Sequence, residues 1–256
     1  MNTILIAMTF VAFLLTMGIR YGTQALVTTL LGDGSPARER RLSLNPARHL
    51  SALGTSVAFA LSFPIGPIVP AGLGWGRPIR TDATRLSIGP NPGTILIALT
   101  GIVTNFVLGI VIAVGLGFIA FTTADAQHIL PCVQLTGGPL QSCLQVWQPG
   151  WALRLEQFAF IFASVNILVG LLNIIPLYPL DGYSILFALL PERAAISYRN
   201  SQATQEMILF GVLLILPFVL TISGLPPTFS PVYLLQTLSL KIMSAFTYFA
   251  PFAENL

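Results

Sequence analysis

Long apolar stretches alternate with short polar ones along the chain, and this pattern predicts membrane-spanning helices. A helix needs about 20 predominantly apolar residues to cross a bilayer, and four stretches reach or approach that length. We expect spans over residues 4–31, 94–121, 151–179 and 207–223. A further apolar or amphipathic helix is expected over residues 232–250, either in the membrane interface or packed against protein.

The segment 53–73 is also apolar, but its prolines and glycines argue against a straight helix. They are Pro64, Gly66, Pro67, Pro70 and Gly72. Proline lacks the N–H that a helix needs, and it interrupts the ladder of hydrogen bonds. We expect a re-entrant hairpin that enters and leaves the membrane on one side, with its backbone buried by other helices. A full crossing is the alternative, and it would place three arginines on the outer side.

The composition is that of an integral membrane protein. Hydrophobic residues make up 54% and charged residues 8% of the 256 residues, whereas soluble domains carry roughly 25% charged residues. We therefore expect a polytopic all-α protein with a single membrane domain over residues 1–256. The net charge of +3 is small, and no basic run is long enough to indicate a nucleic-acid partner. Membrane lipid is the partner that the composition implies.

The basic residues predict the orientation in the membrane. Nine of the twelve lie in the segments 32–52, 75–92 and 183–206, and the segment 122–150 has none. Because cytoplasmic loops carry an excess of Lys and Arg, we expect the three basic segments in the cytosol. The segment 122–150 is then extracytoplasmic.

The two cysteines of the chain, Cys132 and Cys143, lie in this outer segment on either side of a Gly-Gly-Pro turn. Extracytoplasmic cysteines form disulfides readily because their compartment is oxidising. A disulfide between them is one interpretation, and two unpaired thiols are the other.

The stretch 173–182 reads Asn-Ile-Ile-Pro-Leu-Tyr-Pro-Leu-Asp-Gly and directly follows an apolar run. It therefore puts the carboxylate of Asp181 at or near membrane depth, where a charge costs several kcal/mol unless something satisfies it. Two interpretations remain open on local chemistry. Asp181 is either a functional residue or part of an ordinary turn at the cytosolic end of a span.

Four motifs, in their order and spacing, resemble the site-2 protease family of intramembrane zinc metalloproteases, and most closely its short prokaryotic members. The motifs are Leu31–Asp33 followed by Arg41–Pro46, Gly74-Trp75 with Pro78, Thr100–Asn105, and Asn173–Gly182. In the last motif the matching positions are Asn173, Pro176, Pro179, Asp181 and Gly182. The resemblance implies a site-2-protease-like helical core in a prokaryotic cell membrane.

The resemblance also implies where a zinc site would be. In that family an H-E-x-x-H helix supplies two zinc ligands and a general base, and the Asp of the second motif is the third ligand. Here the first motif falls on Arg20, Tyr21 and Gln24, and residues 1–32 contain no His, Asp, Glu or Cys at all. Asp181 alone matches, as a vestigial ligand position. We therefore expect no catalytic residue, no metal ligand and no cofactor.

The leading functional hypothesis is a catalytically inactive pseudoprotease. Such a protein would act as a binding or accessory subunit for other integral membrane proteins or transmembrane segments. One alternative is an active intramembrane metalloendopeptidase with rearranged zinc ligands, in which His49 would approach Asp181. A small transporter or channel is a second alternative, although the chain has few intramembrane polar groups and no inverted repeat.

Arg20 suggests a specific replacement for the lost metal. It stands where a ligand histidine would be, and its guanidinium has the length and shape to pair with the carboxylate of Asp181 in bidentate fashion. One contact would then satisfy two charges that are costly in a membrane. The alternative is that Arg20 extends to an interface or lines a hydrated groove.

Overall fold

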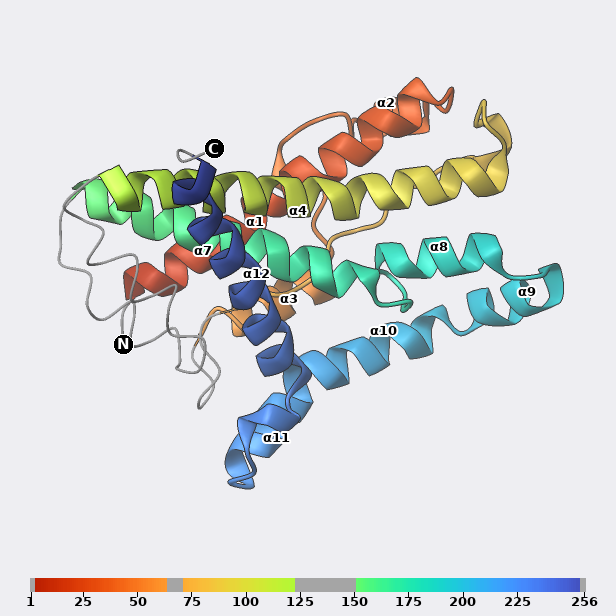
Figure 1. Cartoon of the computed structure of the whole chain (residues 1–256). Coiled ribbons are helices and arrows are strands. Elements are labelled where there is room, and N and C mark those ends of the chain that lie inside the picture. Colours follow the sequence, from red (N-terminus) through yellow and green to blue (C-terminus); the bar gives the residue numbers. More distant parts are fainter. Residues whose placement is uncertain (1–2, 64–70, 123–150, 254–256) are drawn as a thin grey trace.

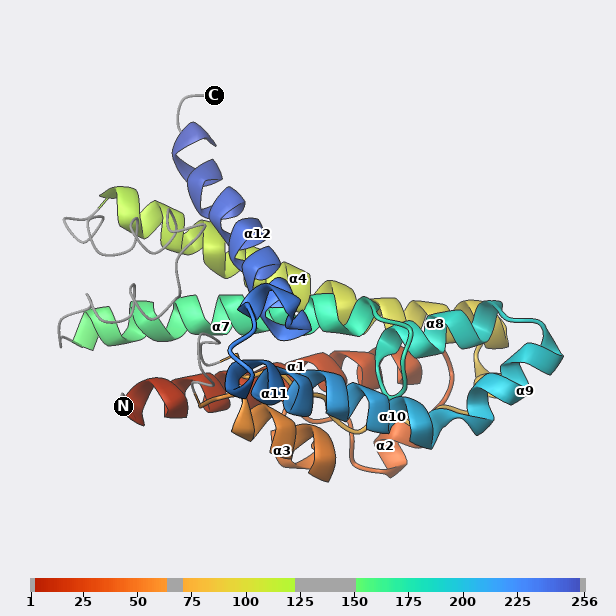
Figure 2. The ribbon, with the colours of Figure 1, turned by 90° about the horizontal axis from the view of Figure 1, so that it is seen from below.

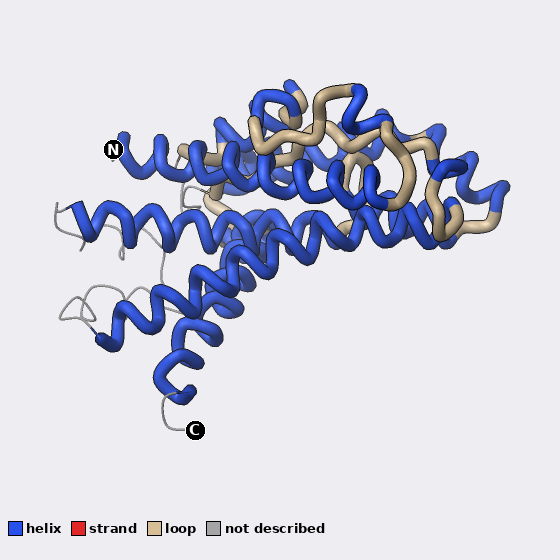
Figure 3. The backbone as a smooth tube through the Cα atoms, turned by 90° about the horizontal axis from the view of Figure 1, so that it is seen from above, coloured by secondary structure: helices blue, strands red, loops and turns tan. Residues whose placement is uncertain are grey.

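The computed structural model describes residues 3–63, 71–122 and 151–253, and throughout these ranges the chain folds into helices and connecting loops (Figure 3). The long helices are α1 (Thr3–Leu30), α4 (Pro90–Thr122), α7 (Trp151–Ile174) and α12 (Pro231–Ala253). The shorter helices are α2 (Ser35–Arg38), α3 (Ala52–Ala60), α8 (Asp181–Leu189), α9 (Glu192–Asn200), α10 (Gln202–Phe210) and α11 (Leu216–Ile222). Short 3-10 turns are η1 (Pro46–Arg48), η2 (Ala83–Arg85) and η4 (Pro227–Phe229), and η3 (Gly211–Ile215) is a π-helical turn.

Four of these segments are long and apolar enough to cross a membrane. They are Thr3–Leu30, Pro90–Phe118, Arg154–Ile174 and Gln202–Ile222. The third ends at Ile174 rather than at the expected residue 179, because Pro176 cannot continue the helix. The fourth runs without interruption through α10, η3 and α11. Its π-helical turn lies just before Pro217. Because proline has no N–H, a carbonyl one turn earlier loses its helical hydrogen bond there.

Helices α1, α4 and α7 pack against one another and form the centre of the molecule (Figure 1). Small residues permit their close approach, as is common in membrane bundles. At Gly109 of α4, for example, an added Cβ would lie 2.5 Å from the Ile167 side chain of α7. Helix α8 follows α7 after a short loop and packs on α4. Helix α12 crosses both α4 and α7 at a steep angle (Figure 2).

The expected hairpin over residues 53–73 is described except for residues 64–70. Its two ends lie side by side, because Leu50 forms an antiparallel bridge with Gly76 and the Arg77 N–H donates to the His49 carbonyl at 2.7 Å. Within the segment, the Ala71 N–H donates to the Leu61 carbonyl at 2.7 Å. The segment therefore returns to the place from which it departs, which is the geometry of a hairpin.

Helix α12 packs on protein through one face. The residues buried on that face are Val232, Gln236, Ser239, Met243 and Thr247. Lys241 is exposed on another face, together with Leu234 and Leu238, so several polar residues of the helix pack on protein while apolar side chains remain exposed. The cysteines Cys132 and Cys143, and the outer segment that contains them, lie outside the described residues.

Candidate functional site

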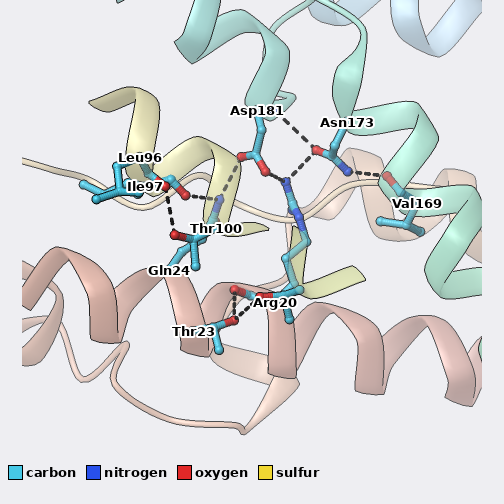
Figure 4. A network of polar contacts seen from close by, with 10 residues as sticks. Arg20, Thr23, Gln24, Leu96, Ile97, Thr100, Val169, Asn173 and Asp181 are labelled. Carbon is cyan, nitrogen blue, oxygen red and sulfur yellow. Dashed lines mark hydrogen bonds and ion pairs between the residues drawn. The ribbon is translucent and has the colours of Figure 1, made fainter. Parts of the chain in front are cut away.

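The predicted ion pair between Arg20 and Asp181 is present at the centre of the helical core (Figure 4). The Arg20 Nη2 atom lies 2.6 Å from Asp181 Oδ2 and 2.5 Å from Asn173 Oδ1. Arg20 is 0% exposed, so it neither reaches an interface nor lines a hydrated groove. The predicted bidentate geometry is wrong, because one nitrogen serves both acceptors and the Asn173 amide takes the place that the second carboxylate oxygen would have taken.

Gln24 binds the other oxygen of the same carboxylate. It lies one turn after Arg20 on α1, so both side chains project from one helical face. Its Nε2 atom donates to Asp181 Oδ1 at 2.9 Å and to the Ile97 carbonyl of α4 at 3.2 Å. The Asp181 carboxylate thus accepts hydrogen bonds from two side chains of α1. These bonds satisfy a negative charge that is costly to bury.

The loop before α8 positions Asp181. Asn173 anchors itself through a 2.8 Å bond from its Nδ2 to the Val169 carbonyl, and its Oδ1 also accepts from the Asp181 N–H at 3.3 Å. Asp181 is the first residue of α8, where the helix dipole favours a negative charge. At Gly182 an added Cβ would lie 2.4 Å from the Ile174 carbonyl oxygen, so the turn from α7 into α8 requires glycine there.

Helices α9 and α10 hold the same loop from its outer side. The Tyr198 hydroxyl donates to the Pro176 carbonyl. Gln205 accepts from the Tyr178 N–H at 2.8 Å through its Oε1, and it donates to the Tyr198 carbonyl at 3.1 Å through its Nε2. Pro179 follows in the loop and borders the cavity described below. All five motif positions therefore lie in or beside one turn that presents Asp181 to α1.

Tyr21, the position at which the sequence resemblance predicts a catalytic Glu, belongs to a separate aromatic and cationic stack. Its ring lies parallel to the His49 ring, with centroids 5.9 Å apart. The guanidinium carbons of Arg20 and Arg41 lie 4.5 Å and 5.8 Å from the Tyr21 ring centroid. The phenol ring therefore stabilises two cations in a buried setting.

His49 is held in the loop region and does not join Asp181 in a common site. Its Nε2 atom lies 2.7 Å from the Ser43 carbonyl oxygen, and its Nδ1 atom lies 3.5 Å from Arg41 Nη2. Within residues 3–63, 71–122 and 151–253, no three His, Cys, Asp or Glu side chains come together in a group that would hold a metal ion. The approach of His49 to Asp181 that rearranged ligands would need is not seen.

The environment of His49 predicts a pH dependence of stability. Burial lowers the pKa of His49, and the charges of Arg41 and Arg48 lower it further. The unfolded chain then takes up a proton on His49 near pH 6.5 while the folded chain resists it, so the free energy of unfolding falls as the pH drops below about 6.5. We expect the thermal midpoint in detergent to fall between pH 8 and pH 5.5, and His49→Gln to reduce that fall.

His128→Gln is the matched control for this measurement, because it removes the second histidine of the chain. It should leave the pH dependence unchanged. A pH dependence that survives His49→Gln and disappears with His128→Gln would contradict the assignment.

A zinc ion does not fit the residues at this site. Zinc ligands in proteins are thiolates, imidazoles and carboxylates, whereas a guanidinium has only donors and is always charged. Arg20 places that positive group 2.6 Å from Asp181 Oδ2, and Gln24 contributes an amide N–H to the other oxygen. The donor set offers a single carboxylate, and both of its oxygens already accept hydrogen bonds.

A cavity of about 240 Å³ lies beside this network, between α1, α4, α8 and the extended segment that precedes η2. Gln24 and Asp181 form part of its wall, together with the hydroxyl-bearing residues Thr81, Thr94 and Ser184. The Asp181 side chain is 11% exposed. A group that enters the cavity therefore meets polar side chains at the level of the ion pair.

Three features of the site were not predicted from the sequence. They are the role of Asn173 as second acceptor for Arg20, the use of the Ile97 carbonyl, and the need for Gly101. An added Cβ at Gly101 would lie 2.3 Å from Gln24 Nε2 and 2.4 Å from Asp181 Oδ2. Gly101 and Asn173 lie within the motifs at 100–105 and 173–182. Their place in these motifs was the sequence signal that could have identified them as site residues.

Comparisons with known proteins agree with this architecture. Residues 80–218 match the family model described as peptidase family M50, a range that includes Asn173 and Asp181 and begins after α1. The chain is 30% identical over 195 residues to the Bacillus subtilis (strain 168) protein named "Putative zinc metalloprotease YwhC". That similarity covers 75% of this chain and 73% of the relative. No solved structure matches.

Proposed function

The chain belongs to peptidase family M50, the site-2 protease family, and from this premise we propose that it is a catalytically inactive member that binds other membrane proteins. It is an integral membrane protein with the helical core of that family. The observation that carries the proposal is the ion pair between Arg20 and Asp181. A positively charged side chain binds the one remaining ligand-type carboxylate.

The chemistry of peptide hydrolysis argues in the same direction. Catalytic zinc sites use three protein ligands and one open position for water, and the metal brings the pKa of that water near 7. Here Arg20 and Gln24 occupy the positions of two ligands, and Tyr21 replaces the carboxylate base. None of these three side chains can activate a water molecule in the way that the family's mechanism requires.

The binding role rests on the cavity beside Asp181. It offers amide, carboxylate and hydroxyl groups at membrane depth, and an unwound transmembrane segment needs such groups for its free backbone N–H and C=O. We propose that the cavity receives a transmembrane segment of another integral membrane protein without cleaving it. The protein then acts as a binding or accessory subunit within the bilayer.

We also propose a location and an orientation. The protein lies in a prokaryotic cell membrane, with the segments 32–52, 75–92 and 183–206 in the cytosol and the segment 122–150 outside. The excess of arginine in the first three supports this orientation. The cavity then opens toward the cytosolic half of the membrane, because residues 78–83 contribute to its wall.

One preparation tests both halves of the proposed function. The full chain is purified from its native membrane, and zinc per protein and co-purified membrane proteins are measured on the same sample. We expect well under one zinc per chain, unchanged by Asp181→Ala, and at least one membrane protein in a fixed ratio. Stoichiometric zinc that is lost in Asp181→Ala would instead show an active metalloendopeptidase with rearranged ligands, and the absence of a partner in a fixed ratio would overturn the binding role.

A gain-of-ligand variant serves as the positive control for the metal measurement. The combined substitutions Arg20→His, Tyr21→Glu and Gln24→His restore the family pattern at the three positions on α1. This variant is expected to bind zinc because Asp181 is already presented to those positions. Adding Asp181→Ala to it should remove the zinc again.

A further inference from the structure

The loop between α2 and α3 lies against α1 within the thickness of the membrane. A Cβ added at Gly18 would lie 2.3 Å from the Leu44 carbonyl oxygen, and one added at Gly22 would lie 3.1 Å from the Leu44 Cδ2 atom. Helix α1 continues for about 18 Å from Gly18 to its end at Leu30. Its full length of about 42 Å exceeds the hydrocarbon thickness of about 30 Å by only about 12 Å. Gly18 and Leu44 therefore remain at hydrocarbon depth even if all of this excess projects beyond Leu30.

Two leucines of this loop present apolar side chains that the described part of the chain leaves exposed. Leu42 is 48% exposed and Leu44 is 67% exposed. Exposure of a leucine to water costs free energy, whereas the acyl chains of a lipid are as apolar as leucine itself. Because Leu44 lies beside a membrane-spanning helix, lipid is the medium that these side chains face.

Four arginines around the same loop carry positive charges that no carboxylate of the described residues neutralises in an ion pair. The ion pairs within residues 3–63, 71–122 and 151–253 join Arg20 to Asp181 and Arg85 to Asp82. The four charges are therefore available to an anion from outside the chain. These arginines, all of them exposed, are Arg40, Arg48, Arg77 and Arg80.

The fold holds the four arginines together through the backbone. Arg48 Nη1 donates to the Arg40 carbonyl at 2.6 Å, and this bond joins the two ends of the loop. The buried guanidinium of Arg41 donates to the Arg77 carbonyl at 2.5 Å, and this bond joins the loop to the segment that contains Arg77 and Arg80. The four positions therefore belong to one structural unit.

The positive charges of this unit act on one another. Burial lowers the pKa of Arg41, and the charges of Arg77 and Arg80 lower it further, while Glu39 acts in the opposite direction. Like charges held at such a distance repel. An anion bound at the loop would relieve this repulsion.

We propose that the loop binds an anionic phospholipid, with its phosphate at Arg40 and Arg48 and its acyl chains over Leu42 and Leu44. A guanidinium matches the geometry of phosphate oxygens and binds them in bidentate fashion. The long arginine side chains reach from the loop toward the headgroups while the leucines stay in hydrocarbon. This surface is separate from the cavity beside Asp181, so the proposal does not depend on the proposed function.

The combination of charges and leucines decides the class of ligand. A zwitterionic headgroup carries a cationic amine of its own, and the excess of arginine disfavours it. An acidic protein segment would satisfy the arginines but would leave Leu42 and Leu44 uncovered. An anionic phospholipid satisfies both features, as is typical of basic clusters beside membrane spans.

Native mass spectrometry of the full chain, released from detergent micelles, tests the proposal by measuring the dissociation constant of the first lipid bound. Phosphatidylglycerol and phosphatidylethanolamine with identical acyl chains are compared, and we expect a preference of about tenfold or more for phosphatidylglycerol. Equal affinities would overturn the proposal. Glycerol phosphate, which lacks acyl chains, should bind far more weakly, and an affinity equal to that of phosphatidylglycerol would show a phosphate site without a lipid.

The combined substitutions Arg40→Gln and Arg48→Gln should weaken phosphatidylglycerol binding about 25-fold, because each arginine contributes about fivefold near an anionic headgroup. Binding of phosphatidylethanolamine should not change. Arg40→Lys with Arg48→Lys keeps both charges and should keep most of the affinity. A loss as large as that of the glutamine variant would mean that charge is not the cause, and the proposal would fail.

Arg193→Gln with Arg199→Gln is the matched control, because it removes two exposed arginines of α9 instead. It should leave the affinity for phosphatidylglycerol unchanged. An equal loss in this control would reduce the effect to net charge and overturn a site at the loop. A co-purified acidic protein that is lost in Arg40→Gln with Arg48→Gln, and that excludes phosphatidylglycerol when bound, would replace the lipid as the occupant.

Discussion

Replacing Asp181 with alanine is expected to lower the free energy of unfolding by about 3–5 kcal/mol, which is typical when one partner of a buried ion pair is removed. Arg20 has no exposed surface, so the variant leaves a full positive charge in the bundle that keeps, among the described residues, the Asn173 Oδ1 contact and the Tyr21 ring but no anion. Gln24 loses an acceptor at the same time. Equilibrium unfolding in detergent micelles, compared with the unaltered chain, measures the effect.

Two further variants separate a buried ion pair from a general loss of packing. Arg85→Ala breaks the exposed contact between Arg85 and Asp82 and should change the free energy of unfolding by no more than about 1 kcal/mol. The double variant Arg20→Met with Asp181→Leu removes both charges and should recover much of the loss, because well-packed apolar residues often replace a buried pair without cost. If the losses in free energy of unfolding of the single variants Arg20→Met and Asp181→Leu simply add in the double variant, Arg20 and Asp181 are not coupled.

The long helices were predictable because their apolar runs are long and carry almost no charge. Their ends were less so. Pro176 stops α7 after Ile174, and a π-helical turn before Pro217 lets α10 and α11 continue as one span. The end of α7 and the π-helical turn both depend on how the backbone accommodates an individual proline. A hydropathy pattern does not predict this backbone geometry.

The ion pair was predictable for a different reason. Arg20 is the only charge in α1, and a lone charge within a span needs a partner. The motif at 173–182 then pointed to Asp181. The sequence did not indicate how the hydrogen bonds are shared, because Asn173 and the second carboxylate oxygen compete for the same nitrogen and only the positions of α7 and α8 decide between them.

The support of the site by α9 and α10 could not be predicted. Tyr198 and Gln205 bind the loop at Pro176 and Tyr178, yet they lie more than 20 residues away in a segment that reads as a polar cytosolic connection. Long-range contacts of polar side chains leave no periodic signal. The same holds for Trp75, whose indole N–H donates to Glu206 at 3.2 Å across two distant segments.

Gly101→Ala is expected to destabilise the protein by about 1–3 kcal/mol, the usual cost of adding a methyl group to a packed interior. The new Cβ would lie 2.3 Å from Gln24 Nε2 and 2.4 Å from Asp181 Oδ2. Neither atom can move away without breaking a hydrogen bond of the buried carboxylate. The variant therefore acts on the ion-pair network from α4, without changing any charge.

Gly115→Ala in the same helix is the matched control. Nothing lies within 4 Å of a Cβ added there, so the change should be neutral or stabilising by up to about 1 kcal/mol, since alanine favours helices more than glycine does. Combining Gly101→Ala with Asp181→Ala should cost less than the sum of the two, because the second change removes one of the two clashes. Equal effects of the two glycine variants would mean that α4 does not hold the carboxylate in place, and the unfolding free energies in micelles decide the question.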